Sequence, residues 1–214
     1  MKGETRNVTN IIKDERGVVI IWILLFMPFL LMATNYTITQ TQAVTGADID
    51  LQAAVQSAVK AAAGQVTSDS QAAGDARVNT VIGHSAFRRE LARNLGLDQT
   101  TFSPLSGSFL IEAPEYVLVI YNGDDTYVSR GAEDAKVYQL SSGALSSTGF
   151  LGTGFPYTFG IDNSTVYLSA SGIKQVTLDR PGVVAVVTVK HKKLMGSSDP
   201  NLQMSRWASA KIVY

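Results

Sequence analysis

Residues 18–33 read VVIIWILLFMPFLLMA, an unbroken apolar run that begins just after the charged residues Lys13 to Arg16. As a helix, these sixteen residues rise about 24 Å at about 1.5 Å each, which is short of a hydrocarbon core about 30 Å thick. The crossing therefore needs Gly17 and residues 34–36 as well, with the Arg16 side chain reaching back to the headgroups. The run predicts one membrane-spanning helix over residues 18–36.

Basic residues predict the direction of the crossing. Lys60 is the first basic residue after the run, whereas four precede it, namely Lys2, Arg6, Lys13 and Arg16. Because Lys and Arg beside a span are retained in the cytoplasm, we expect residues 1–17 on the cytoplasmic side of the cell membrane and the rest of a single-pass protein outside it. A cleaved secretory signal is the alternative, but residues 32–36 hold no convincing small-x-small cleavage site.

Pro28 lies inside the predicted span. Its missing N–H and its ring bend or locally open a helix, which a bilayer tolerates. An ordinary transmembrane kink is the commoner meaning of such a proline, and a hinge that helps the subunit leave the membrane is the alternative.

Helical periodicity continues beyond the span and predicts an amphipathic stalk helix over residues 37–64. Small and apolar residues recur every three or four positions on one stripe of this helix, namely Val44, Ala47, Leu51, Ala54, Ala58 and Ala61. Small side chains let a neighbour approach closely, so we expect the stripe to pack against the chain's own domain. Packing against another copy is the alternative. Gly64 marks the expected end of the helix.

Residues 65–214 form the predicted extracytoplasmic domain. A second helix is expected from about Arg77 to Asn94, and Asn122-Gly123 predicts a turn between strands. Runs rich in Val, Ile, Tyr and Thr predict strands at residues 109–111, 116–121, 136–140, 166–169, 174–178, 183–190 and 204–213. The fold class is therefore α+β and pilin-like: a long N-terminal transmembrane and amphipathic helix, a second helix, and a mostly antiparallel β-sheet in the exterior domain.

A glycine- and aromatic-rich loop, Gly143 to Gly160, interrupts the strands. No Gly-Lys-Ser/Thr and no helix follow its glycines, so a phosphate-binding loop is not indicated. Its aromatic residues have two interpretations of equal weight. They form a contact surface for a partner, or they belong to a long hairpin and fold back onto the sheet. The residues concerned are Phe150, Phe155, Tyr157 and Phe159.

The composition excludes several classes of function. The chain has no cysteine, two histidines far apart in sequence, and 18 basic against 18 acidic side chains. Without cysteine there is no thiol nucleophile, and the balanced charge gives no basic field that would attract nucleic acid. The sequence also contains no catalytic motif and no calcium-loop pattern. We expect no enzymatic activity, metal, cofactor or small-molecule substrate.

A family resemblance rests on the order of several features in Asp14 to Ala63. These are Asp14-Glu15-Arg16-Gly17 before the apolar run, Pro28 within it, and Leu51-Gln52-Ala53-Ala54 at the start of an alanine-rich helix. In this order they resemble the N-terminal region of TadE/TadG-like proteins of the bacterial tight-adherence (Flp) pilus assembly system. The resemblance covers about the first third of the chain. It implies a pilin-like or membrane-anchored subunit whose partners are other pilus-assembly subunits or copies of itself.

The resemblance also raises the question of processing. In pilin-like members a prepilin peptidase cuts after the glycine before the span, which corresponds here to Gly17, with Val18 as the new N-terminus. Those members usually carry a glutamate at the fifth position after the cut, where this chain has Trp22. A tryptophan cannot pair with a neighbouring subunit's terminal amine inside an apolar filament. We therefore expect the TadG-like, unprocessed condition, with cleavage as the alternative.

Two functions follow from these expectations. The first is an accessory subunit that assists assembly or anchoring of a tight-adherence pilus. The second is a membrane-tethered extracytoplasmic domain that recognises a ligand or surface through the loop Gly143 to Gly160.

Overall fold

The computed structural model of the chain describes residues 15–191 and 203–213. The chain divides into two units, Met1–Gly46 and Ala47–Tyr214, and the helix α1 (Glu15–Ala63) begins in the first and ends in the second. Most of the predicted cytoplasmic segment lies outside the described residues. So do the side chains of residues 15–18, 40, 43 and 44, which include Val18 and the stripe residue Val44.

In the first unit, α1 contains one stretch that is long and apolar enough to cross a membrane, Val19–Thr39. Its large apolar side chains are exposed, including Trp22 and Phe29. Gly17 and Val18 fall in the first turn of α1, and Pro28 lies within the helix without ending it. Five threonine hydroxyls each donate to the carbonyl four residues earlier, at Thr34, Thr37, Thr39, Thr41 and Thr45. Their donors are thus satisfied inside the helix, without any partner outside it.

The second unit is α+β, with two antiparallel sheets. Its helices after α1 are α2 (Ser68–Ala72), α3 (Thr80–Leu95) and the short 3₁₀ turn η2 (Val128–Arg130). Five strands form the larger sheet in the order β3-β2-β1-β7-β8 and three form the smaller one in the order β5-β4-β6. The strands are β1 (Glu115–Tyr121), β2 (Ala135–Ser141), β3 (Ala144–Gly149), β4 (Tyr157–Ile161), β5 (Val166–Tyr167), β6 (Lys174–Leu178), β7 (Gly182–Lys190) and β8 (Gln203–Lys211).

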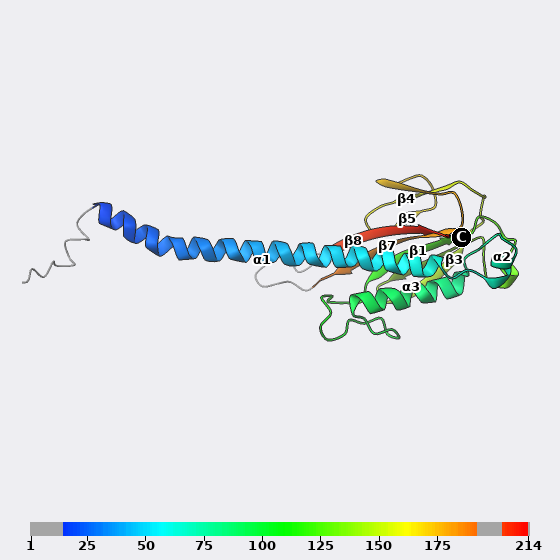
Figure 1. The fold of residues 1–214 in the computed structure, drawn as a ribbon, viewed down its shortest axis with the longest axis horizontal. Coiled ribbons are helices and arrows are strands. Elements are labelled where there is room, and N and C mark those ends of the chain that lie inside the picture. Colours follow the sequence, from blue (N-terminus) through cyan, green and yellow to red (C-terminus); the bar gives the residue numbers. More distant parts are fainter. Residues whose placement is uncertain (1–14, 192–202, 214) are drawn as a thin grey trace, which may run out of the picture. The chain divides into compact units, whose positions relative to one another are not determined.

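The larger sheet is the middle of three layers in this unit (Figure 1). Successive residues of a strand point to opposite faces, so Leu118 and Ile120 of β1 face the helices whereas Val119 and Tyr121 face the smaller sheet. The central strand β7 is buried on both faces, which explains why its sequence is a nearly continuous apolar run. The unit therefore has two apolar cores, one on each side of β1 and β7.

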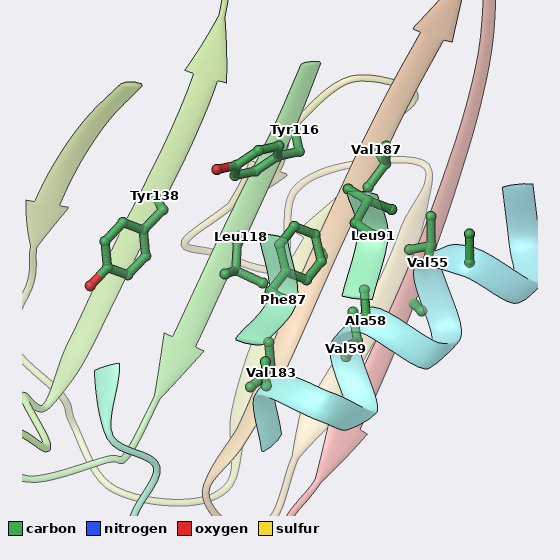
Figure 2. Packing of buried hydrophobic residues seen from close by; sticks show 14 of the residues in the cluster. Val55, Ala58, Val59, Phe87, Leu91, Tyr116, Leu118, Tyr138, Val183 and Val187 are labelled. Carbon is green, nitrogen blue, oxygen red and sulfur yellow. The ribbon is translucent and has the colours of Figure 1, made fainter. Parts of the chain in front are cut away.

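The C-terminal part of α1 packs with α3 on one face of the larger sheet (Figure 2). Leu51, Ala54 and Ala58 of the predicted stripe are buried, Ala47 is half-buried, and Val55 and Val59 widen the contact. These residues share one core with Phe87 and Leu91 of α3, and the Ser57 hydroxyl of α1 donates to the Glu90 carboxylate of α3 at 3.0 Å. Residues 47–63 of the predicted stalk helix thus belong to the second unit, and their buried face, from Leu51 to Ala63, is part of its core.

The α+β class, the long apolar N-terminal helix and the mostly antiparallel sheet are confirmed. The strand predicted at residues 109–111 is wrong, because only an isolated bridge joins Leu110 to His191 there. The second helix starts at Thr80 rather than Arg77, since the Asn79 side chain accepts from the Ile82 amide at 2.9 Å and caps it. The strands β3 and β4 lie inside the segment that the sequence predicted as a loop.

Candidate functional site

The apolar helix is the first candidate functional element. Over Val19–Thr39 the side chains are exposed and the threonine hydroxyls at its end are bonded within the helix. Such a surface is costly in water but suited to lipid or to the apolar side of another helix. Within residues 15–191 and 203–213, one helix is therefore long and apolar enough to serve as a single-pass membrane anchor.

Histidine and acidic side chains do not assemble into a catalytic or metal centre within the described residues, where no group of three His, Cys, Asp or Glu could hold a metal ion. His84 of α3 is buried, and its Nε2 lies 2.8 Å from the hydroxyl oxygen of Tyr116. Its ring stacks on Tyr138 with centroids 4.0 Å apart. Burial, together with the nearby Arg88 charge, lowers the pKa of His84 to about 4, so the ring is neutral at pH 7. His84 is thus a packed core residue in this arrangement.

The aromatic residues of the predicted loop gather around Tyr121, at the end of β1. Ring centroids lie 6.1 Å from Tyr121 for Phe150, 5.4 Å for Phe155, 4.6 Å for Tyr157 and 5.5 Å for Phe159. Phe159 is fully buried and the other three are half-buried against the core between the sheets. The aromatics fold back onto the core between the sheets, as in the second interpretation, but the long hairpin of that interpretation is wrong, because β3 pairs with β2 whereas β4 pairs with β5 and β6.

Tyr121 also makes hydrogen bonds to the backbone of this segment. Its hydroxyl donates to the carbonyl of Gly154 at 2.8 Å and accepts from the amide of Thr153 at 3.1 Å. Gly123 follows with φ +85°, and a Cβ there would lie 2.5 Å from the Phe155 ring. The turn after β1 therefore needs glycine both for its backbone conformation and for the close approach of the ring. Of this segment, Leu151 remains the large apolar residue most open to solvent, at 82 % exposed.

A polar cluster fastens the chain before α3 to the end of β1. The buried Asn122 side chain accepts from the Val78 amide at 2.8 Å and donates to the Val78 carbonyl at 2.9 Å. The guanidinium of Arg77 contacts the carboxylates of Asp75 and Asp124. Burial alone would raise the pKa of the Asp124 carboxyl, but hydrogen bonds from Arg77 and Thr126 lower it below its ordinary value. Both terminal nitrogens of the Arg77 guanidinium are paired with carboxylates, and the Asn122 amide is bonded to the backbone, so these contacts join segments of the fold.

A groove runs along β8, and we call it the β8 groove. It consists of two hollows of about 360 and 460 Å³ that share Asn163, Ser205 and Arg206. The first is also lined by Trp207, by Gln52 of α1 and by Lys174 at the start of β6. The second continues to Ser164 and Gln203. Most of the lining side chains are amides, hydroxyls or charged groups around a single indole ring.

Sequence reasoning missed the β8 groove. Its residues come from α1, from the turn after β4 and from the strands β4, β6, β7 and β8. In the sequence, each of these elements is a separate stretch of residues. The one available signal is Trp207, a large ring in a strand whose other residues are mostly small or polar. The spanning helix, by contrast, is where the apolar run predicts it.

The chain was compared with protein-family models, curated proteins and solved structures. No family model matches the chain, and no curated protein or solved structure matches it.

Proposed function

We propose that the chain is a membrane-anchored, pilin-like accessory subunit that assists assembly or anchoring of a tight-adherence pilus. The proposal rests on the difference between the two parts of α1. Residues 19–39 expose apolar side chains, whereas residues 51–63 are built into the core of an antiparallel α+β domain. A single helix that serves both roles is the organisation expected of a pilin-like subunit, and it agrees with the resemblance of residues 14–63 to TadE/TadG-like proteins.

The proposed orientation places the N-terminus in the cytoplasm and the domain Ala47–Tyr214 outside. Its support is the asymmetry of basic residues around the span. The chain has no cysteine, so no disulfide stabilises this domain, which must rely on packing. The well-filled cores on both sides of β1 supply that packing.

Membrane anchoring is tested by extraction of the full-length protein from its own cells. We expect the protein to stay with membranes through alkaline carbonate and to be released by mild detergent. A tag at the C-terminus should be reached by protease from outside the inner membrane, and a tag at the N-terminus only after lysis. Recovery of the full-length protein in the soluble fraction without detergent would contradict the anchor.

The pilus assignment is tested by purification of the tagged protein from the mild detergent extract. We expect pilus components to come with it and deletion of its gene to reduce piliation. A matched control replaces residues 19–39 with a Leu/Ala helix of the same length, which keeps an anchor but changes its surface. Normal piliation of the deletion strain, together with no co-purifying pilus component, would refute the assignment.

Processing is tested by mass spectrometry of the mature N-terminus. We expect the intact N-terminal segment, because Trp22 stands where processed pilin-like proteins usually have a glutamate. A mature protein that starts at Val18 would contradict this expectation and would place the chain among the processed subunits.

The alternative function is ligand recognition through the loop, and its test must leave the strands of the loop segment in place. Removal of residues 143–160 would delete β3 and all of β4 except Ile161, and these strands belong to different sheets. Leu151→Ser instead changes an exposed residue and leaves the ring cluster around Tyr121 in place. Loss of a surface interaction in this variant, with piliation intact, would favour recognition through the loop.

A further inference from the structure

The β8 groove lies entirely within the domain Ala47–Tyr214 and is elongated. Its two hollows share three lining residues, so together they follow the N-terminal half of β8 from Gln203 to Trp207. The wall opposite β8 is anchored, because the Thr188 hydroxyl contacts the Ser205 hydroxyl at 2.9 Å and donates to the Asn163 carbonyl at 3.4 Å. An elongated groove with fixed walls suits a chain-like ligand better than a compact one.

The lining combines one aromatic ring with many hydrogen-bonding groups. Trp207 is half-buried, since its inner part packs against the core between the sheets. Around it are the amides of Gln52 and Asn163, the hydroxyl of Ser205 and the carboxylate of Asp162. A sugar ring has the matching chemistry, with hydroxyl groups around its edge and C–H bonds on its faces that pack against an indole.

The first hollow holds the side-chain charges of Lys174, Arg206 and Asp162, and the Asp162 carboxylate accepts from the Asn163 amide at 2.9 Å. An acidic sugar is therefore favoured by the ammonium of Lys174 and not by a net positive charge of the groove. Arg206 is already paired with the carboxylate of Asp48. Lys174 is exposed, its Nζ lies 5.7 Å from the centroid of the Trp207 ring, and no ion pair joins it to an acidic side chain of the described residues. This ammonium lies over the Trp207 ring, so a carboxylate on the ligand would give it a partner at the open face of the ring. One available cation is too few for nucleic acid, whose affinity depends on many phosphate contacts.

A peptide strand is a poorer occupant than a saccharide. β8 is an edge strand, and an added strand would need its outward backbone groups. The side-chain amide of Gln52 already donates to the carbonyl of Trp207 at 3.3 Å, in the middle of that edge. A peptide strand would therefore have to displace Gln52 from this carbonyl, whereas a ligand bound by the side chains of the groove would not.

We propose that the β8 groove binds an extended acidic saccharide, with one sugar ring against Trp207 and its carboxylate at Lys174. The groove consists only of residues of the second unit, so saccharide binding does not depend on the pilus assignment. It gives the exterior domain a direct contact with acidic polysaccharide of a surface or matrix.

The test uses the full-length protein in detergent micelles, titrated with a hexamer of galacturonic acid or with a neutral glucose hexamer and measured by calorimetry. The variants are Lys174→Gln, which removes the ammonium, and Trp207→Phe, which keeps a ring of smaller area. Lys60→Gln, an exposed lysine of α1 outside the groove, is the matched control. Near-ultraviolet circular dichroism and a thermal melt establish that each variant is folded.

We expect the acidic hexamer to bind more tightly than the neutral one, and added salt to reduce the difference. Lys174→Gln should weaken binding of the acidic hexamer about two- to fivefold and leave the neutral one unchanged. Trp207→Phe should weaken binding of both about three- to tenfold, whereas Lys60→Gln should change neither. The proposal is refuted if a folded wild-type protein binds neither hexamer at millimolar concentration. Equal affinities for Lys174→Gln and Lys60→Gln would also refute it, as would binding of an extended hexapeptide in preference to both sugars.

Discussion

His84 should make the stability of the C-terminal domain depend on pH between pH 7 and pH 5. The ring is buried between Tyr138 and the hydroxyl of Tyr116, and burial with the nearby Arg88 charge lowers its pKa from 6.5 to about 4. In the unfolded chain the ring binds a proton near pH 6.5, whereas in the folded chain it does so only near pH 4. The stabilisation by the neutral ring is therefore complete above pH 6.5 and is lost as the pH falls towards 4.

The two pKa values fix the size of the effect. Each pKa unit of difference corresponds to about 1.4 kcal/mol, so integration from pH 7 to pH 5 gives a loss of about 2 kcal/mol in the free energy of unfolding. For a domain of this size, that loss lowers the melting temperature by about 4–8 °C.

The measurement is thermal unfolding of the full-length protein in detergent micelles at several pH values, followed by near-ultraviolet circular dichroism. His84→Gln removes the titrating ring and should be less stable at pH 7, but its stability should change by about 2 kcal/mol less than the wild type between pH 7 and pH 5. His191→Gln is the matched control and should keep the His84 contribution. Equal pH dependence of the wild type and His84→Gln would refute the reasoning.

Three further substitutions test the packing, each by the same thermal measurement at pH 7. Ala58→Leu forces a larger side chain into the fully buried contact of α1 and should cost about 1–3 kcal/mol, whereas Gln56→Leu on the exposed side of the helix should cost little. Tyr121→Phe removes a hydroxyl that joins two backbone groups of the aromatic segment and should cost about 1–3 kcal/mol. Gly123→Ala places a Cβ 2.5 Å from the Phe155 ring at a φ of +85° and should cost about 1–3 kcal/mol. A change below about 0.5 kcal/mol in any of the buried variants would contradict the contact on which it rests.

Patterns that repeat within a few residues predicted much of the fold. The apolar run, the helical stripe through Leu51 and Ala58, and the Val-rich strand β7 are visible because their burial follows the local period of a helix or strand. The strands β3 and β4 were missed for the opposite reason. β3 is exposed along its whole length, and β4 is short and glycine-containing, so neither shows the apolar alternation of a half-buried strand.

The sequence by itself determined that this protein has one lipid-compatible helix, an α+β domain without disulfides, and a helix stripe suited to close packing. Only the tertiary structure decided that the loop aromatics enclose Tyr121 and that Gln52, Asn163, Lys174 and Trp207 meet in one groove. The physical reason is distance along the chain. The hydrophobic period of a helix is set by residues three or four positions apart. The groove, in contrast, brings Gln52 together with residues more than a hundred positions later in the chain, and only the folded sheets place them side by side.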